Sequence, residues 1–571
     1  MNLAPESPAN DTLTACLRHW ATVKPEDPAL TFADYSVDRD GRRRTLTWRE
    51  LAARVDAAAS ALPVRPGDRV AVLCPQGVDY VVGFLAALTV GAIAVPLFDP
   101  GLPGHAGRLT AVLADCAPTA VVTTSAARPA VAEFLGGSVE IVVVDRAATT
   151  RTRPAPEAQA GDVAYLQYTS GSTRSPAGVV LTHANALANV RQAVRGLGLD
   201  PREASTVSWL PLFHDMGLIL GLITPLVLGL RSVLMDPLAF IERPVRWLEL
   251  LGDRPGAWSA APNFAFHYCA SRVRDADRAR LRLGGVAAIV NGAEPINPDV
   301  LDRFHTAFAA AGYRPRMTRP SYGLAEATVF VTTAADAAPR VTTFDRDALG
   351  EGTAREAGAG VRLVACGAPA GQHVALVAPD TAVALPDGSV GEIWVHGPNV
   401  GDGYWQNPLD STETFGARLT GDHSGLPEGP WLRTGDLGVR HGGELYIAGR
   451  LKDLLIVDGR NHYPQDVEAT VAAADQAIRP GSVAAFAIEG ADTEDAVVVA
   501  EHRGHAELTE QSERDLAATV RRLVADAHGL ALRDVVLVPQ GHVPRTSSGK
   551  IARSACRDRY LAHEYGKALV R

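Results

Sequence analysis

Residues 165–183 read YLQYTSGSTRSPAGVVLTH. Their lead-in, residues 163–168, is short, mostly apolar and rich in tyrosine, which predicts a strand. Hydroxyl side chains and a glycine follow at once, in Thr169, Ser170, Gly171, Ser172 and Thr173. The glycine lets successive N–H groups face one concavity, and the hydroxyls add donors. This loop suits the phosphates of a nucleotide, although a plain Ser/Thr turn between two elements has the same composition.

Length and composition bound the class of protein. The chain has 571 residues, 47% of them hydrophobic, which is enough for more than one domain. Its net charge of -9 argues against nucleic acid as the main partner. No secretory leader is visible, and the longest apolar run, residues 216–230, falls short of the roughly 20 residues of a membrane span. The six cysteines are scattered and form no CxxC pair. We expect a cytoplasmic protein.

Lysine is scarce in this sequence. Of the 55 basic residues, only Lys24, Lys452, Lys550 and Lys567 are lysines. A lysine supplies a compact point charge that the planar guanidinium of arginine does not. Lys452 and Lys550 are therefore candidates for a role that arginine cannot fill.

Strand and helix patterns alternate through the first part of the chain. This alternation, with short connections, predicts parallel sheets with helices on their faces. Strands are predicted at 69–74, 92–96, 120–124, 139–145 and 285–291, and helices at 51–62, 79–88, 108–116 and 183–197. Residues 208–217 read as a strand that runs into a turn, and Asp436 is placed in a turn.

The pattern changes after residue 334. Residues 334–362 are rich in Asp, Ala, Gly and Thr and weakly periodic, which is typical of a surface insertion. Beyond residue 452, helices at 464–474 and 512–528 and strands at 483–488, 496–502 and 534–537 predict a small α+β domain.

Polar turns follow two of the apolar strands. Residues 291–295 read NGAEP, and residues 320–328 read PSYGLAEAT. In open parallel sheets, ligands bind beyond the carboxyl ends of the strands, so these turns are candidate walls of one site. Tyr322 offers a ring for stacking, and Glu326 offers a hard oxygen ligand for Mg²⁺. Each motif taken alone is equally compatible with an ordinary loop.

In this order, these motifs resemble the adenylate-forming superfamily of acyl-CoA synthetases, luciferases and peptide-synthetase adenylation domains. The turns at 434–436 (TGD) and 449–450 (GR) and the segment 544–550 (PRTSSGK) complete the resemblance, which covers almost the whole chain. The segments LQYTSGSTR, WLPLFHDMGL, SAAPNFAF and DGRNHYP and the insertion are most similar to the fatty acyl-AMP ligases. The resemblance implies a large α/β domain with a distorted β-barrel subdomain (1–451) and a small mobile α+β lid (452–571). It also implies that the insertion 334–362 keeps the lid from the pose that uses CoA.

The resemblance implies ATP-dependent activation of a fatty acid to an acyl adenylate, with Mg²⁺, and acyl transfer to the phosphopantetheine arm of an acyl carrier protein in lipid, lipopeptide or polyketide biosynthesis. Lys550 would bridge the carboxylate and the α-phosphate, and His214 would lie beside the carboxylate. Glu326 would bind Mg²⁺, with Thr173 as a second ligand. Residues 169–173 would hold the β- and γ-phosphates, and Lys452 would be the hinge. The other nucleotide contacts would be Gly292, Ala293, Glu294, Ser321, Tyr322, Gly323, Leu324, Asp436 and Arg450, and the acyl contacts Leu218, Ile219 and Phe264.

The sequence departs from the superfamily in its opening loop. The superfamily pattern continues Thr-Gly-x-Pro-Lys-Gly, whereas residues 173–178 read TRSPAG. The mobile lysine that often contacts pyrophosphate is therefore Ala177, and Arg174 replaces a glycine, as in the fatty acyl-AMP ligases. Which group balances the pyrophosphate charge stays open.

Three alternatives stay open beside this interpretation. An acyl-CoA synthetase of the same fold would form acyl-CoA directly. An amino-acid adenylation domain would place an aspartate on the site wall, for which no clear counterpart is visible. A catalytically dead scaffold would not need Glu326, Asp436 and Lys550. At the end of the chain, Arg545, Arg553, Arg557 and Arg559 would either dock an acidic carrier protein or form a solvated face.

Overall fold

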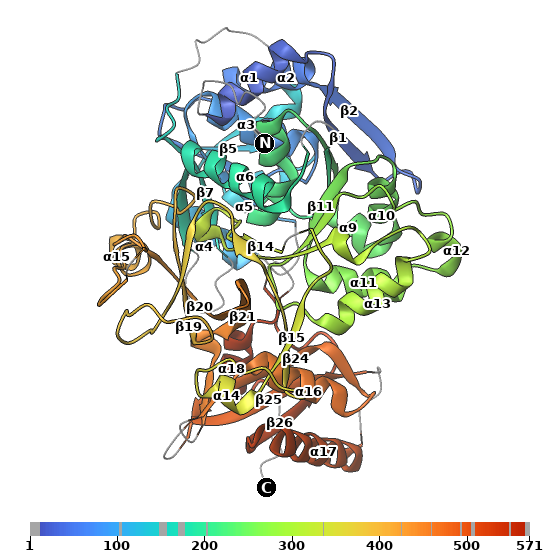
Figure 1. Cartoon of the computed structure of the whole chain (residues 1–571). Helices are drawn as coiled ribbons and strands as arrows, with labels where there is room; N and C mark the ends of the chain where they lie inside the picture. Colours follow the sequence, from blue (N-terminus) through green and yellow to red (C-terminus); the bar gives the residue numbers. More distant parts are fainter. Residues whose placement is uncertain are drawn as a thin grey trace.

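The computed structural model describes residues 12–101, 106–147, 157–169, 177–200, 204–334, 336–423, 425–457, 460–490, 494–503, 509–546 and 550–565. Two mixed sheets with helices around them form its upper part in Figure 1, and the carboxyl-terminal elements, in orange and red, form its lower part. One hydrophobic core joins both upper sheets, because Val72, Tyr165, Val233 and Ile289 all belong to it. The predicted α/β class is confirmed.

Most of the polar turns that were predicted to form a site follow strands of the first sheet. Its strand order is β17-β14-β13-β12-β11-β9-β10-β1-β2. The strands from β13 to β1 are parallel, whereas β2, β14 and β17 are antiparallel to their neighbours. Their bounds are β17 Ala368–Pro369, β14 Thr332–Thr333, β13 Thr318–Tyr322, β12 Ala288–Asn291, β11 Ala257–Ala261, β9 Ser205–Ser208, β10 Arg231–Met235, β1 Pro28–Asp34 and β2 Arg42–Thr47.

The second sheet carries the opening motif. Its order is β6-β5-β3-β4-β7-β8, and only β8 is antiparallel to its neighbour among these strands. Strand β7 has the predicted bounds and leads directly into Thr169. The strands are β6 Glu140–Val143, β5 Ala120–Thr123, β3 Arg69–Val72, β4 Ile93–Pro96, β7 Val163–Tyr168 and β8 Gly178–Thr182.

Capping residues explain where the helices begin and end. Helix α6, His183–Leu197, has the predicted bounds because Thr182 and Asn185 form a capping box and Gly198 adopts the left-handed conformation that ends helices. Helix α2, Trp48–Ala61, begins before the predicted residue because Thr47 and Glu50 form a second capping box. The other helices of this part are α1 Leu13–Val23, α3 Val78–Thr89, α4 Ala106–Cys116, α5 Arg128–Leu135, α7 Asp215–Leu218, α8 Thr224–Leu228, α9 Pro237–Glu242, α10 Val245–Gly252, α11 Asn263–Arg272, α12 Asp275–Arg278 and α13 Pro298–Phe308.

Short helical segments complete this part. The apolar run 216–230 is buried, as predicted, and folds as α7, a π-helical turn Ile219–Ile223 and α8. The prediction for 208–217 is wrong in part, because the strand, β9, ends at Ser208 and α7 begins at Asp215. The 3₁₀ turns are η1 Val144–Arg146, η3 Pro315–Met317, η4 Ala325–Ala327 and η5 Leu451–Asp453.

A third sheet follows in the order β18-β19-β20-β21, with every strand antiparallel to its neighbours. Its bounds are β18 His373–Val377, β19 Val390–His396, β20 Leu432–His441 and β21 Glu444–Arg450, and helix α15 is Pro408–Phe415.

The placement of Asp436 in a turn is wrong. Asp436 lies within β20, opposite Arg450 of β21. Gly438 borders a register shift against β21, and Gly435 lies within a second register shift, against β19. A β-bulge and a turn both favour glycine, so the sequence signal is the same.

The carboxyl-terminal part has its own sheet, β24-β25-β26, and a small hairpin of β22 and β23. Its apolar core, which includes Val467, Val498 and Val520, is separate from the core of the upper sheets. The elements are β22 Leu455–Val457, β23 Arg460–His462, α16 Pro464–Ala474, β24 Ile478–Glu489, β25 Glu494–His502, α17 Glu510–His528, β26 Leu532–Val538 and α18 Arg553–Leu561. The predicted α+β character is thus observed, while the boundary at residues 451 and 452 stays a prediction.

The segment predicted as a surface insertion is not a simple surface loop. It contains the hairpin of β15 (Val341–Phe344) and β16 (Val361–Val364), with helix α14 (Arg346–Gly350) between them. Phe344 and Leu349 are buried and pack with Tyr446 and Tyr463. Figure 1 shows α14, in yellow, among the orange and red elements of the carboxyl-terminal part.

Candidate active site

The carboxyl ends of neighbouring parallel strands bring the predicted turns to one edge of the first sheet. Strands β9, β11, β12 and β13 lie side by side in that sheet. Strand β9 is followed by the loop to His214, and β11 by the start of α11 with Phe264. Strand β12 is followed by residues 292–294, and β13 by residues 323–326. This shared edge is where parallel sheets bind ligands.

Asp436 is the centre of a buried polar group. Its side chain accepts a hydrogen bond from Tyr322 Oη at 2.7 Å and one from Arg450 Nε at 2.8 Å. The ion pair with Asp436 is the main cause that raises the pKa of Arg450. Burial, followed by the charge of Asp436, raises the pKa of Tyr322. Tyr322 therefore stays a neutral donor, and the carboxylate of Asp436 is held in one orientation.

The two turns approach each other so closely that glycine is required. A Cβ atom on Gly323 would lie 1.5 Å from the carbonyl oxygen of Val329, and one on Gly292 would lie 2.8 Å from that of Ser321. Ala293 adopts a positive φ of 65°, which L-residues rarely do. Gly292 therefore packs against Ser321 of the neighbouring segment, whereas the close contact of Gly323 lies within its own turn.

His214 and Asp215 form a pair at the start of α7. His214 Nδ1 lies 2.6 Å from Asp215 Oδ1, and the N–H of Met216 donates to the same carboxylate oxygen at 2.7 Å. Burial would raise the pKa of Asp215, but the charges of His214 and Lys550 hold it below its usual value. Asp215 was not among the predicted site residues, although its position next to His214 was a usable signal.

Glu326 is held by a residue that the sequence motifs did not identify. Its Oε1 accepts a hydrogen bond from Tyr404 Oη at 2.9 Å, and its carbonyl accepts one from Gly401. Burial raises the pKa of Glu326, while the hydrogen bond from Tyr404 and the charge of Arg450 lower it. A half-buried carboxylate with one fixed oxygen suits Mg²⁺, which usually binds one or two carboxylates together with substrate phosphates. Among the described residues, no group of three or more His, Cys, Asp or Glu side chains forms a metal cage by itself.

Lys550 reaches this edge from the far end of the chain. Thr546 N–H donates to the carbonyl of Lys550 at 2.8 Å, and Lys550 N–H donates to Thr546 Oγ1 at 3.2 Å. Burial and the charge of Arg450 lower the pKa of Lys550, whereas Asp215, Glu294 and Asp436 raise it. The ammonium group therefore lies within electrostatic range of residues from β12, α7 and β20.

The residues predicted to contact the acyl chain belong to the apolar core or pack against it. Leu218 and Ile219 are fully buried, and Phe264 is partly buried against the core. Glu294 accepts the backbone N–H of Phe264, and burial raises the pKa of its carboxyl group. The ring of Phe264 meets Trp209 edge to face at 6.0 Å between centroids. The wall near His214 is thus lined by aromatic and aliphatic side chains.

The remaining predicted residues are placed less centrally. Ser321 Oγ bonds to Thr333 Oγ1 at 2.7 Å, and Leu324 precedes the 3₁₀ turn that carries Glu326. Lys452 is exposed in the turn between β21 and β22. Thr169 closes the neck of the opening loop, because its N–H donates to the carbonyl of Ala177 at 3.2 Å. The other residues predicted to hold phosphates, Ser170, Gly171, Ser172 and Thr173, lie outside the described residues, as does Arg174.

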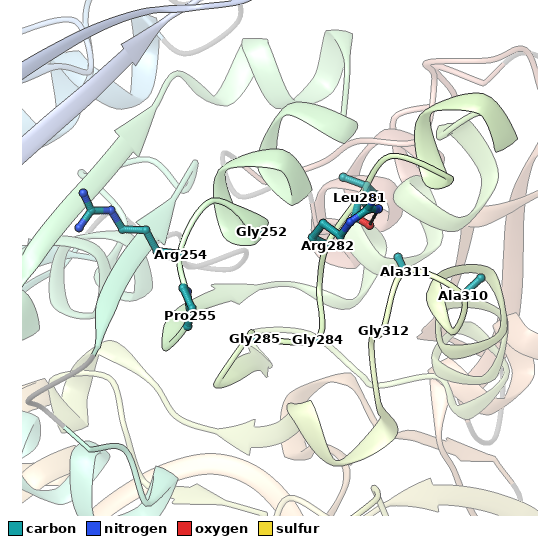
Figure 2. A pocket seen from close by; sticks show the side chains of 10 residues that line it. All are labelled: Gly252, Arg254, Pro255, Leu281, Arg282, Gly284, Gly285, Ala310, Ala311 and Gly312. Carbon is teal, nitrogen blue, oxygen red and sulfur yellow. Dashed lines mark hydrogen bonds between the residues drawn. The ribbon is translucent and has the colours of Figure 1, made fainter.

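A pocket of about 510 Å³ lies elsewhere (Figure 2). Its lining includes Pro255, just before β11, and Gly285, just before β12. It therefore lies at the amino ends of these strands, opposite to the edge that carries the candidate site. No predicted site residue lines it.

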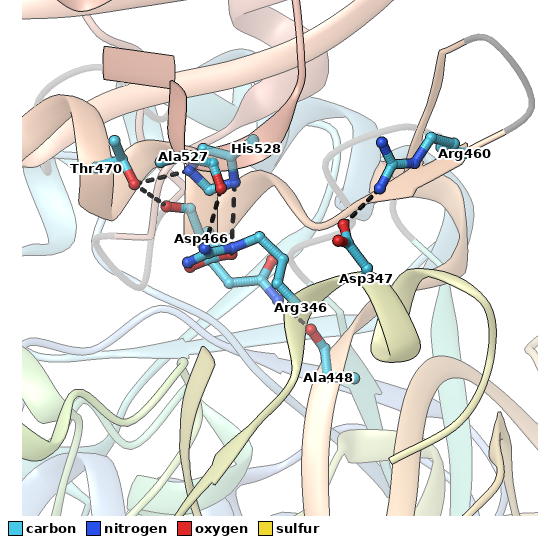
Figure 3. Close-up of polar contacts among 9 residues, drawn as sticks. Arg346, Asp347, Ala448, Arg460, Asp466, Thr470, Ala527 and His528 are labelled. Carbon is cyan, nitrogen blue, oxygen red and sulfur yellow. Dashed lines mark hydrogen bonds and ion pairs between the residues drawn. The ribbon is translucent and has the colours of Figure 1, made fainter. Parts of the chain in front are cut away.

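The insertion contacts the carboxyl-terminal part through charged and polar groups (Figure 3). Arg346 of α14 pairs with Asp466 of α16 at 2.7 Å and donates to the carbonyl of Ala527 at 3.0 Å. Asp347 pairs with Arg460, and Asn461 donates to the carbonyl of Gly350. These contacts link α14 to β23, α16 and α17.

The arginines near the end of the chain do not form a uniform surface. Arg553 pairs with Asp453 and Glu468, each at 2.7 Å, and these three side chains are largely buried. Arg545 donates to the carbonyl of Gly481. Arg557 and Arg559 have side chains that are 47% exposed, and Arg545 is exposed as well although its guanidinium is bonded to Gly481.

The fold is that of the adenylate-forming enzymes. Residues 17–405 match the family of AMP-binding enzymes, and residues 452–568 match the AMP domain of Disco-interacting protein 2-like proteins. The chain belongs to the AMP-binding enzyme family, and within it to the fatty acid–AMP ligases.

Curated relatives and solved structures carry this assignment. The long-chain-fatty-acid–AMP ligase FadD26 of Mycobacterium marinum is 44% identical, over 97% of this chain and 98% of its own length. The putative fatty-acid–CoA ligase FadD21 of Mycobacterium tuberculosis is 43% identical, over 98% and 99%. One of the fatty acyl-adenylate ligases studied from E. coli and L. pneumophila superposes with a TM-score of 0.85 at 30% identity, over 97% of this chain and 98% of that one. The L. pneumophila ligase in complex with acyl adenylate and pyrophosphate gives a TM-score of 0.75 at 31% identity, over 98% of both chains.

None of the helices in the described ranges is long and apolar enough to cross a membrane.

Proposed function

We propose that this protein activates a fatty acid with ATP and passes the acyl group to the phosphopantetheine thiol of an acyl carrier protein. The carboxylate oxygen attacks the α-phosphorus of ATP, the bond from this phosphorus to the bridging oxygen breaks, and pyrophosphate leaves. The carrier thiol then attacks the acyl carbon, and AMP leaves. The observation that carries the proposal is the position of Lys550, whose charge interacts with Asp215, Glu294, Asp436 and Arg450 at the carboxyl edge of the first sheet.

The nucleotide would lie along the two glycine turns. Asp436 has carboxylate oxygens that suit the ribose hydroxyls, and Tyr322 and Arg450 keep these oxygens in place. The backbone at Gly292 and Gly323 would border the adenine. Because the two turns already pack against each other where Gly292 meets Ser321, they need little ordering when the ligand binds beside them.

Charge stabilisation would supply most of the catalysis. Negative charge accumulates around the α-phosphorus as the carboxylate approaches, and fixed cations lower the energy of that arrangement. Lys550 would contact both the carboxylate and the α-phosphate, where a point charge suits two converging oxygens. Glu326 would hold Mg²⁺, which neutralises phosphate charge when bound, and His214 would orient the fatty carboxylate.

The apolar wall supports a fatty acid rather than an amino acid. Leu218 and Ile219 are buried aliphatic side chains, and the ring of Phe264 packs against Trp209. Leu218 and Ile219 are already fully buried, so within this set the apolar area that a hydrocarbon tail would remove from water is that of the partly buried Phe264.

Formation of acyl-CoA is the second candidate, because FadD21, at 43% identity, is named a putative fatty-acid–CoA ligase. The contacts of α14 with Asp466, Ala527 and Arg460 favour the carrier as the acceptor, since they tie the small part to the insertion. A lid held in this way rotates less readily to the pose that CoA would need.

One experiment separates these activities. The full chain is incubated with Mg²⁺, ATP and fatty acids of graded length. One arm also contains CoA, a second contains a phosphopantetheinylated acyl carrier protein, and a third contains neither. The products are identified by mass. We expect acyl adenylate in every arm and acyl carrier in the carrier arm. Rapid acyl-CoA formation would show that CoA, and not a carrier protein, is the acyl acceptor. Absence of acyl adenylate with every fatty acid would refute the whole proposal.

A further inference from the structure

The turn that carries Glu326 contains a strained residue. Thr328 has φ 68° and ψ −58°, and the N–H of Val329 donates to the carbonyl of Ala327 at 2.8 Å, which closes a three-residue turn around it. Such turns are rare, and a residue branched at Cβ is an outlier at positive φ. In the part of the chain that the structure describes, no other Cβ-branched residue has a positive φ. Strain of this kind persists only where the surroundings impose it.

Two buried asparagines impose this turn, and we call them the amide clamp. Asn189 of α6 donates to the carbonyl of Phe330 at 2.8 Å and accepts the N–H of the same residue at 3.0 Å. Asn399 donates to the carbonyl of Ala327 at 3.2 Å and to that of Phe330 at 3.3 Å. Both asparagines are fully buried. Because the two carbonyls lie on either side of Thr328 in the chain, these bonds hold the strained turn closed.

Segment 399–404 also holds Glu326 directly. The carbonyl of Asn399 accepts a hydrogen bond from the hydroxyl of Thr328 at 2.7 Å. Gly401 N–H donates to the carbonyl of Glu326 at 2.9 Å, and Tyr404 Oη donates to its carboxylate at the same distance. One short segment therefore fixes the backbone of the turn and one oxygen of the Glu326 side chain.

This segment is itself anchored to β8 and to α6. Val180 N–H donates to the carbonyl of Gly403 at 2.9 Å, and Asp402 N–H donates to the carbonyl of Val180 at 3.0 Å. Gln192 Nε2 of α6 donates to Asn399 Oδ1 at 3.1 Å. The segment that holds the carboxylate is therefore fixed to the second sheet and to the helix that follows it.

We propose that Asn399 is a positioning residue for Glu326 as a ligand of Mg²⁺. This ion demands a nearly ideal octahedral arrangement of oxygens, and groups that orient a ligand change the affinity for the metal. Asn399 keeps the turn at Thr328 closed, and the closed turn sets the direction in which the Glu326 side chain leaves the backbone. This inference rests on the proposed role of Glu326 and adds the residue that sets its position.

Nucleotide binding with and without metal tests this role without any turnover. The affinity of the full chain for a non-hydrolysable ATP analogue is measured by calorimetry with Mg²⁺ and with a chelator, and the ratio of the two affinities is the gain from the metal. We expect Asn399→Ala to lower this gain by about tenfold, with the metal-free affinity nearly unchanged. Hydrogen exchange in residues 327–331 should become faster, because the turn opens. An unchanged gain, or a lost gain with unchanged hydrogen exchange, would overturn the proposal.

Gln372→Ala is the matched control, since buried carbonyls need donors in any fold. Gln372 is buried and donates to the carbonyl of Val331, one position beyond the amide clamp. Its loss removes a buried amide without touching the turn at Thr328, so the gain from the metal should stay as in the unchanged protein. Equal losses of the gain in Gln372→Ala and Asn399→Ala would reduce Asn399 to a general structural support.

Thr328→Val carries the test if Asn399→Ala does not fold. It removes the hydroxyl that donates to the carbonyl of Asn399 and keeps the branching at Cβ, so it breaks the same link from the other side. We expect a smaller gain from the metal and faster hydrogen exchange in residues 327–331. A gain equal to that of the unchanged protein would overturn the proposal.

Glu326→Gln separates this inference from the proposed function. If this variant keeps the gain from the metal, Glu326 is not the metal ligand, and both that assignment and the role of Asn399 fall. If Glu326→Gln loses the gain and Asn399→Ala keeps it, only the role of Asn399 falls. Fatty-acid-dependent ATP–pyrophosphate exchange in the unchanged protein tests the reaction itself, independently of both variants.

Discussion

At the scale of single residues, the charge of Lys550 depends on side chains from distant parts of the chain. Asp215 and Glu294 attract its ammonium group, and Arg450 repels it. We expect Lys550→Ala to lower the rate of adenylate formation by at least about a thousandfold, because a fixed charge at the reacting oxygens is lost. Fatty-acid-dependent ATP–pyrophosphate exchange measures this.

Lys24→Ala is the matched control for that variant. Lys24 contacts the ring of Trp20 and the carbonyl of Gly229, on α1 and after α8, away from the candidate site. Its exchange rate should match that of the unchanged protein. Near-normal exchange in Lys550→Ala, with a normal melting temperature, would remove Lys550 from the mechanism.

The pKa of Lys550 also predicts a pH dependence. Burial, and then Arg450, lowers this pKa from the ordinary value of 10.5. The ammonium form is required, and it is lost as the pH rises through the lowered pKa, so the exchange rate should fall on the alkaline side below pH 10.5. Lys550→Arg keeps its charge throughout this range and should lose the alkaline decline even if its rate is lower. A decline at the same pH in this variant would assign it to another group.

The sequence motifs pointed to the candidate-site residues that lie within them, and gave no sign of residues that reach the candidate site from another element. Glycine-containing motifs marked Tyr322, Glu326 and Asp436, although Asp436 lies in a strand and not in a turn, and the structure brings the three to one edge. Tyr404 contacts Glu326 across 78 positions of sequence, and no local pattern marks such a hydrogen bond. Asn399 reaches Ala327 in the same way.

At the scale of elements, local sequence signals predicted the bounds of helices better than they predicted the structure of the insertion. Helix α6 has capping residues at both ends, and its bounds are as predicted. Helix α14 has only five residues, and its partners, among them Asp466 and Ala527, lie more than a hundred positions away. Its role as a contact element is therefore a tertiary property, which composition and periodicity do not encode.

The contacts of α14 predict what a single substitution there does. Arg346→Ala removes the pair with Asp466 and the hydrogen bond to Ala527, so the docking of the small part should weaken by about 1–3 kcal/mol. Faster hydrogen exchange in α14 and at the start of α16 measures the weakening. We also expect some acyl-CoA formation, because the lid rotates more freely.

Arg355→Ala is the control within the same insertion. Arg355 pairs with Asp345 at 3.0 Å, so both partners belong to the insertion and the pair does not reach the small part. Hydrogen exchange in α16 and the products formed with CoA should stay unchanged. Equal effects of both substitutions would indicate a general loosening of the insertion instead of a specific link through Arg346.

At the scale of the whole molecule, the proposed carrier has to approach the small part without disturbing adenylation. Arg557 and Arg559 of α18 are exposed, whereas Arg553 is committed to Asp453 and Glu468. Reversal of charge at Arg553 would break buried ion pairs, so a test of docking has to use the exposed pair alone.

We expect the double variant Arg557→Glu, Arg559→Glu to slow acyl transfer to an acidic carrier protein by about tenfold, because complementary charge accelerates encounter. ATP–pyrophosphate exchange should stay unchanged, since neither side chain contacts the candidate site. The transfer defect should shrink at high salt, where exposed charges are screened. The double variant Arg514→Glu, Arg522→Glu makes the same charge change on α17, where both arginines pair with acidic neighbours one helical turn away. If the α17 control shows the same transfer defect as the α18 variant, the defect reflects net charge. If the α18 variant loses exchange as much as it loses transfer, its effect is on adenylation and not on docking.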